Sequence, residues 1–257
     1  MPMDVTDRQY FKAWLKAVGG SKPTKLWRDF ISQAELPPFD FSLTASAVYS
    51  ANIEGNSIDL NAFMRSKLRG QTVRFKTKEH QEIELLNEAY TFARTHALTE
   101  KNLLAAHAHM AATLLPRSSL EKYRDQMVYV YSGAGMEYAA IEPEFVRGAM
   151  RVLFAEIRGL KKTPLDVAGV FYHAALIHLV FVHIHPFMDG NGRAARLLEK
   201  WFLASHLGKE AWHVSSEWYY KEHQAAYYKN IKIGLNYYTL NYDRCVPFLT
   251  MLVKSLA

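Results

Sequence analysis

Residues 166–189 read DVAGVFYHAALIHLVFVHIHPFMD, and no residue between the two aspartates carries a formal charge. A segment of this length could cross a bilayer. It also contains Tyr172, Gly169, Pro186 and four histidines, and it lacks flanking Trp/Tyr belts. A helix buried at the centre of a core explains this pattern better. The sequence therefore predicts an all-α fold built around this helix, with no membrane partner.

Length and composition indicate one globular unit. The chain has 257 residues, 49% of them hydrophobic and 22% charged, and neither a repeat nor a Pro/Gly/Ser-rich linker divides it. We therefore expect a single domain over residues 1–257. One cysteine, Cys245, excludes a disulfide framework and a multi-thiolate metal site. The start, Met1-Pro2-Met3-Asp4, has no signal-peptide pattern, so a cytoplasmic location is expected.

The net charge of +6 favours anionic partners, including nucleotides. One looser basic cluster is interpreted as a solvated surface; it comprises Arg65, Lys67, Arg69, Arg74, Lys76 and Lys78. The 15 tyrosines and 14 phenylalanines could stack on bases, but most fall at helical core spacing. A nucleic-acid partner is therefore not favoured.

Helical patterns dominate the rest of the chain. They predict helices over residues 11–18, 26–34, about 42–54, 79–96, 99–115, 143–158, 163–183, 192–206, 216–231 and 242–255. Ser42 or Thr44 can cap the third helix, and Gly55 can end it. Thr163 is the expected cap of the long buried helix, with Pro164 at its first position. Residues 127–140 predict the one β-hairpin, because β-forming residues flank a Ser-Gly-Ala-Gly turn.

The chemistry is concentrated in residues 184–196, IHPFMDGNGRAAR. Pro186 disfavours α geometry at His185, so the buried helix must end there. Residues 189–192 are turn formers that lead into another helix. A glycine-containing loop before a helix N-terminus binds anions, phosphate above all, because free N–H groups and the helix dipole favour negative charge.

Charged side chains around this loop fit a nucleotide phosphate site. Arg193 and Arg196 are one helical turn apart and can both contact phosphate oxygens. Asp189 offers an oxygen ligand for Mg²⁺, which prefers one or two carboxylates plus substrate phosphates. His185 can accept a proton near neutral pH.

Three other interpretations of these residues exist. The glycines could form an ordinary helix–helix turn. Gly190-x-Gly192-x-x-Ala195 fits a degenerate dinucleotide pattern, but no strand precedes it. A metal cluster of His178, His183 and His185 is disfavoured, since the first two point away from each other on a helix.

Residues 185–196 resemble the H-x-F-x-[DE]-G-N-G-R-x-x-R signature of Fic domains, with every fixed position matched. Two further segments resemble parts of the family. Tyr123-Arg124 resembles the segment ahead of its target-docking flap. Ser216 and Tyr227-Tyr228 resemble the segment that closes the core and helps to hold the base.

The resemblance implies a Fic-type helical bundle with one β-hairpin flap, and transfer of AMP from ATP to a Ser, Thr or Tyr hydroxyl of a target protein. His185 would be the general base, and Asp189 would hold Mg²⁺. Phosphate and nucleotide contacts would come from Gly190, Asn191, Gly192, Arg193, Arg196 and Tyr228. Phe187 would anchor the loop in the core. The flap, about 127–140, would pair with an extended segment of a target protein that the sequence cannot name.

Residues 50–55, SANIEG, resemble the family's inhibitory [S/T]-x-x-x-E-[G/N] motif. Ser50, Glu54 and Gly55 lie at the end of the predicted helix, where Ser50 and Glu54 share one face. A carboxylate at a helix C-terminus favours a cationic partner, and the resemblance names Arg196. The N-terminal region, residues 1–60, would thus restrain a catalytic core over 79–257.

Other functions remain open at this point. The same site could transfer another nucleotide or a phosphoryl group, or could remove AMP with Glu54 positioning water. A non-enzymatic helical module that binds nucleic acid or regulates a partner is a third class. A homodimer that buries part of residues 57–78 is conceivable.

Overall fold

The computed structural model describes residues 3–256 apart from 21, 33–34, 69–76 and 134. Helix α8 (Val167–Ile184) is buried along almost its whole length, and α9 (Asn191–Leu207) packs against it. Its sequence is apolar enough to cross a membrane, yet 94% of it is buried inside the protein. The predicted all-α fold around this segment is confirmed.

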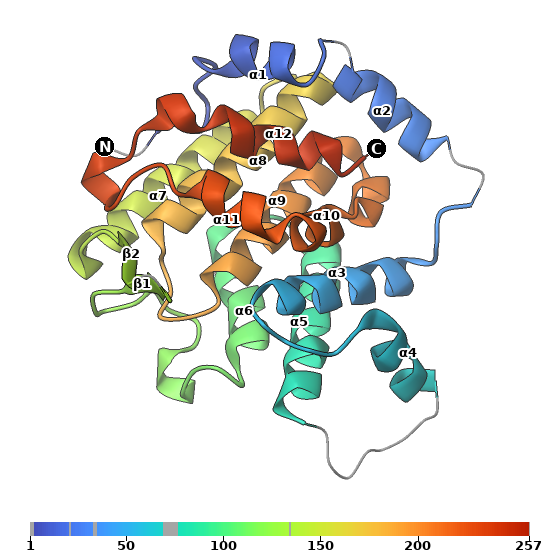
Figure 1. Ribbon diagram of the computed structural model, residues 1–257, viewed down its shortest axis with the longest axis vertical. Helices are drawn as coiled ribbons and strands as arrows, with labels where there is room; N and C mark the ends of the chain where they lie inside the picture. Colours follow the sequence, from blue (N-terminus) through green and yellow to red (C-terminus); the bar gives the residue numbers. More distant parts are fainter. Residues whose placement is uncertain (1–2, 21, 33–34, 69–76, 134, 257) are drawn as a thin grey trace.

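The other helices surround this pair (Figure 1). They are α1 (Phe11–Ala17), α2 (Lys22–Ile31), α3 (Phe39–Ile53), α4 (Leu60–Leu68), α5 (Lys78–Thr95), α6 (Glu100–Ala111), α7 (Pro143–Leu160), α10 (Ser216–Glu222), α11 (Gln224–Ile231) and α12 (Val246–Lys254). Short 3₁₀ turns lie at Arg117–Ser119, Lys209–His213, Tyr237–Thr239 and Tyr242–Arg244. In Figure 1, α1 and α12 lie at one end of the bundle and α4 and the start of α5 at the other.

The predicted hairpin is also confirmed. Strands β1 (Tyr129–Ser132) and β2 (Gly135–Ala139) pair antiparallel, with an irregularity between Val130 and Tyr131. The far side of β2 makes a single bridge between Ala139 and Asn236. The hairpin packs beside the C-terminal end of α8, because the Tyr138 hydroxyl donates to the His183 carbonyl oxygen at 2.6 Å.

Two predicted helix caps were wrong. The N-cap of α8 is Asp166, not Thr163, and its carboxylate accepts from the Gly169 N–H at 2.8 Å. Asp166 competes better because it is the last capping residue before the apolar run. Helix α3 begins at Phe39 after Pro38, so Ser42 and Thr44 lie inside it and do not cap it.

Several other bounds also differ from the prediction. Helix α6 ends at Ala111, and the predicted 216–231 helix is interrupted at His223. Helix α4 was not predicted. Arg65 and Lys67 on α4 and Lys78 at the start of α5 are exposed, as expected for a solvated surface. The rest of that basic cluster, Arg69, Arg74 and Lys76, lies outside the described residues.

Candidate active site

The loop between α8 and α9 starts with an unusual backbone conformation. His185 ends α8 with φ 53° and ψ 59°, in the left-handed region, where non-glycine residues are uncommon. The predicted end of the helix before Pro186 is therefore confirmed, although the residue turns left-handed and not extended. The surrounding structure holds this conformation, since the Arg124 side chain donates to the His185 carbonyl oxygen at 2.8 Å.

The interior of the loop is fixed by buried side chains. Phe187 has no exposed surface and stacks on His107, with ring centroids 3.5 Å apart. The His107 ring donates from Nε2 to the Asp189 carbonyl oxygen at 2.9 Å. The Asn191 side chain bonds to both the N–H and the carbonyl oxygen of Phe187, at 2.9 and 2.8 Å. Both functional groups of the Asn191 amide are thus used to shape the loop.

The imidazole of His185 is oriented as a base would need to be. Its Nδ1 donates to the Val182 carbonyl oxygen at 3.1 Å, which leaves Nε2 as the acceptor nitrogen. Burial lowers the pKa of His185 to about 4 and outweighs the hydrogen bond to Val182 and the nearby carboxylates. The ring is therefore neutral at pH 7.

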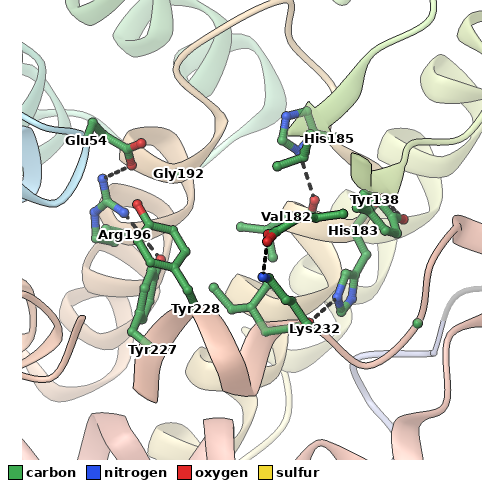
Figure 2. Close-up of a pocket in the computed structure, with 14 residues that line it drawn as sticks. Glu54, Tyr138, Val182, His183, His185, Gly192, Arg196, Tyr227, Tyr228 and Lys232 are labelled. Atoms are coloured by element: carbon green, nitrogen blue, oxygen red, sulfur yellow. Dashed lines mark hydrogen bonds and ion pairs between the residues drawn. The ribbon is translucent and has the colours of Figure 1, made fainter. Parts of the chain in front are cut away.

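His185 lies on the wall of a cavity of about 170 Å³. Glu54, Gly192, Arg196 and Tyr228 line the same cavity. Figure 2 shows Glu54 and Arg196 on one side of it and His185 on the other. The structure thus brings together five residues that the sequence analysis singled out from segments far apart in the chain.

Asp189 lies in the loop beside this cavity. One carboxylate oxygen, Oδ1, accepts from the Gly190 N–H at 2.5 Å and from the Arg193 guanidinium at 3.1 Å. Arg193 also contacts Glu82. The Asp189 side chain is 50% exposed, and no group of three His, Cys, Asp or Glu residues that could hold a metal occurs among the described residues. A lone carboxylate fits Mg²⁺ that is bound mainly through substrate phosphates.

Arg196 is fully buried and is held by the end of α3. Its Nη2 donates to Glu54 Oε1 at 2.7 Å and to the Ser50 carbonyl oxygen at 3.0 Å. Its Nε donates to the Ser50 hydroxyl at 2.8 Å, and Nη1 to the Tyr227 hydroxyl at 3.3 Å. Burial opposes ionisation of Glu54, but the charges of Arg196 and Arg193 hold the pKa of its carboxyl below the ordinary value. The contact is therefore an ion pair at neutral pH.

The Glu54 carboxylate also covers the first turn of α9. A Cβ at Gly192 would lie 2.5 Å from Glu54 Oε1, so a larger residue there would displace this carboxylate. Gly55, with φ +100°, ends α3 directly after Glu54, as predicted. The Tyr228 hydroxyl donates at 2.9 Å to the carbonyl oxygen of Ile53, the last residue of α3. Ser216 is buried and does not line this cavity.

Four residues at four-residue spacing join α3 to the core, and we call them the α3 ladder. They are Ser42, Ser46, Ser50 and Glu54. Ser42 contacts His213 at 2.8 Å, and Ser46 accepts from Lys200 at 2.5 Å. Lys200 is fully buried and pairs with Glu217 at 2.6 Å. Ser42 was predicted only as a possible cap and Ser46 was not singled out, although their spacing from Ser50 was a usable signal.

The comparisons with known proteins agree with this fold. Residues 97–203 match the model of the Fic/DOC family. The chain is 29% identical over 163 residues to "Protein adenylyltransferase Fic" of Nematostella vectensis, covering 59% of this chain and 35% of that protein. It is 26% identical over 158 residues to "Protein adenylyltransferase fic-1" of Caenorhabditis elegans, covering 58% of this chain and 29% of that protein. The matches thus span about a third of these curated relatives.

A solved structure of a Fic family protein from Desulfovibrio desulfuricans superposes with a TM-score of 0.76 at 23% identity. The superposition covers 95% of this chain and 71% of that one. The shared fold thus extends on both sides of the matched residues 97–203, which themselves contain the whole loop from His185 to Arg196. Over residues 97–203 the chain therefore matches the Fic/DOC family, and its fold is that of a solved Fic family protein.

Proposed function

We propose that this protein is an adenylyltransferase that moves AMP from ATP to a Ser, Thr or Tyr hydroxyl of a target protein, and that Glu54 restrains it. The observation that carries the proposal is the cavity in which a neutral His185 faces Gly192 and Arg196 at the start of α9. A base beside an anion-binding helix N-terminus suits an attack on a phosphate. The names of the relatives support the same activity.

The reaction assigns one task to each group. The hydroxyl oxygen of the target attacks the α-phosphorus of ATP, and its proton passes to Nε2 of His185. The bond from the α-phosphorus to its bridging oxygen breaks, and pyrophosphate leaves. Backbone amides of residues 190–192 and the side chains of Arg193 and Arg196 stabilise the phosphate charge.

Asp189 would hold Mg²⁺ together with the nucleotide phosphates, and the ion would supply further charge neutralisation. Tyr228, on the cavity wall, would contact the base of the nucleotide. Asn191 would contribute its backbone N–H, because its side chain is committed to Phe187. The hairpin would bind the target as an added strand.

The restraint follows from the pairing of Arg196. Because Glu54 occupies this guanidinium, the outer phosphates of ATP lose a cationic partner. The α-phosphate is then held out of line with the incoming hydroxyl, and a misplacement of about 1 Å costs on the order of 10²-fold in rate. The Glu54→Gly variant frees Arg196 and restores alignment.

The test is incubation of wild type and Glu54→Gly with labelled ATP, Mg²⁺ and a cell lysate. We expect label on protein bands to rise about 10²-fold in the variant. Glu54→Gln, which keeps the shape but removes the charge, should give an intermediate gain. The Glu54→Gly, His185→Ala double variant should lose about 10²–10⁴-fold while still binding ATP. Label transfer by that double variant at the Glu54→Gly rate would overturn the mechanism.

Removal of AMP is a second candidate, favoured by one observation. The Glu54 side chain is 29% exposed at the cavity, close enough to the first turn of α9 to position a water. Wild type should then release AMP from a labelled target that Glu54→Gly has modified, and Glu54→Gly itself should not. Parallel labelling with GTP, CTP and UTP tests the choice of donor.

A further inference from the structure

Arg124 is a buried cation without a carboxylate partner among the described residues. Its residue surface is 4% exposed, and all three of its side-chain hydrogen bonds end on main-chain carbonyl oxygens. A guanidinium is rigid and planar, so three simultaneous acceptors are fixed relative to one another. Burying a charged group is costly unless it is hydrogen-bonded, and these three carbonyl oxygens offset part of that cost.

The three acceptors belong to two functional parts of the molecule. Nε donates to the carbonyl oxygen of His185 at 2.8 Å. Nη1 donates at 2.8 Å to that of Gln126, just before β1, and Nη2 donates to that of Ile141, just after β2. The Arg124 N–H also donates to the Pro186 carbonyl oxygen at 2.9 Å. One side chain therefore joins both ends of the hairpin to the proposed base.

A second side chain attaches the hairpin to the C-terminal end of α8. The Tyr138 hydroxyl on β2 donates to the His183 carbonyl oxygen at 2.6 Å. Figure 2 shows Tyr138 beside His183, on the side of the cavity where His185 lies. Strand β2 is bridged at Ala139 by Asn236, whereas β1 has no strand partner on its outer edge within the described part of the chain. That edge is the one open to an added strand.

We propose that Arg124 is a positioning residue that fixes the register between a target strand on the β1 edge and the His185 imidazole. The inference rests on the proposed function. Successive side chains of a strand lie about 3.3 Å apart and point to opposite faces. A hairpin tied rigidly to His185 therefore presents one particular hydroxyl to Nε2, and a loosened hairpin presents several. Arg124 would thus set which hydroxyl receives AMP as well as how fast.

The experiment compares Arg124→Lys, Arg124→Ala and Tyr138→Phe, each in the Glu54→Gly background, by self-modification with ATP and Mg²⁺. Modified hydroxyls are mapped by mass spectrometry, and the affinity for a non-hydrolysable ATP analogue is measured by calorimetry. Arg151→Ala is the matched control, because Arg151 is an exposed arginine on α7.

For Arg124→Ala we expect a rate about 10²-fold lower, a changed distribution of modified hydroxyls, and nucleotide affinity within about twofold of the parent. Arg124→Lys and Tyr138→Phe should change the distribution in the same direction with smaller rate losses. Added guanidinium ions should partly restore Arg124→Ala. Arg151→Ala should match the parent in rate and in sites.

The outcomes separate the two proposals. If the Glu54→Gly parent transfers label but Arg124→Lys and Tyr138→Phe keep both its rate and its sites, the inference is wrong and the proposed function stands. A uniform loss at every site, with nucleotide affinity falling in parallel, also overturns it, because that result indicates only a structural role. If the parent transfers no label, the proposed function fails and takes this inference with it. Thermal unfolding identifies a variant that does not fold, and the two conservative variants then decide.

Discussion

The contacts of helix α9 with α8 and with α3 differ in chemistry. Helix α8, with a mean hydropathy of 1.8, is mainly apolar, although His178 Nδ1 donates to Glu199 Oε2 on α9 at 2.8 Å. Helix α3 instead contributes the α3 ladder, whose hydroxyls and carboxylate contact Lys200, Arg196 and the nearby His213. Helix α9 therefore has one mainly apolar neighbour, α8, and another, α3, that is joined to it by hydrogen bonds and an ion pair.

This difference distinguishes contacts that fix the position of α9 from a contact that another anion can replace. Apolar packing is non-directional and depends on many close contacts made at the same time. An ion pair such as Glu54–Arg196 needs only an anion at the right place, and a phosphate can provide it. The α8 side therefore sets the position of the loop, whereas the end of the α3 side can give way to a ligand.

The largest effect on stability should come from the buried charge in the α3 contact. Lys200→Met leaves Glu217 buried without its cation, and breaking such a pair costs about 3–5 kcal/mol. Urea unfolding measures the loss, with the exposed Lys229→Met on α11 as the control, expected within about 0.5 kcal/mol of wild type. Equal midpoints for the two variants would show that the middle of the α3 ladder is as replaceable as its end.

A slightly smaller loss is expected within the apolar core. Leu198 on α9 has no exposed surface, and Leu198→Ala should cost about 2–5 kcal/mol through lost burial and a cavity. In the Glu54→Gly background its transfer rate per folded molecule should stay close to the parent rate. A rate that falls with stability intact would contradict the separation of the two sides.

The first position of the α3 ladder should matter least for stability. Ser42→Ala removes one hydroxyl from His213 and should cost about 1 kcal/mol. Because α3 is then held less firmly, transfer by the otherwise wild-type protein should rise, though less than with Glu54→Gly. Thermal unfolding and label transfer on the same sample check both parts, and a Ser42→Ala protein that loses transfer would be the contrary result.

The smallest effect concerns pH. Burial lowers the pKa of His185 to about 4, so the base stays deprotonated above that value. The kcat/KM of Glu54→Gly should change less than about twofold from pH 6 to 8 and should fall only as the pH approaches about 4. An inflection near the ordinary histidine value of about 6.5 would show that the buried environment of His185 does not persist during turnover.

The sequence predicted the parts whose signals are local. The uncharged run of α8 and the contiguous motif from His185 to Arg196 contain their own evidence of burial and of a turn before a helix N-terminus. The caps of α8 and α3 were predicted wrongly because several capping residues stand close together and tertiary packing chose among them. Residue 166, not 163, faces the first free N–H groups.

Contacts between residues far apart in the chain could not be predicted from such local signals. Glu54 and Arg196 are 142 residues apart, and only the family resemblance linked them. His107 and Lys200 gave no signal for their roles, and the resemblance placed Arg124 ahead of the flap without indicating its contacts. Each acts on main-chain or buried groups brought close only by folding. A single polar residue that will be buried has no sequence pattern that indicates which group it will bind.

The four-residue spacing of the α3 ladder makes the length of α3 a determinant of the Glu54–Arg196 contact. Each residue advances an α-helix by about 100°, so one residue deleted between Ser50 and Glu54 would turn the carboxylate away from α9. Ser42, Ser46 and Ser50 would keep their partners, and the catalytic loop would be untouched. A single deletion within residues 51–53 would therefore remove the Glu54–Arg196 contact, while Ser50, Glu54 and the whole loop from His185 to Arg196 stay in the sequence.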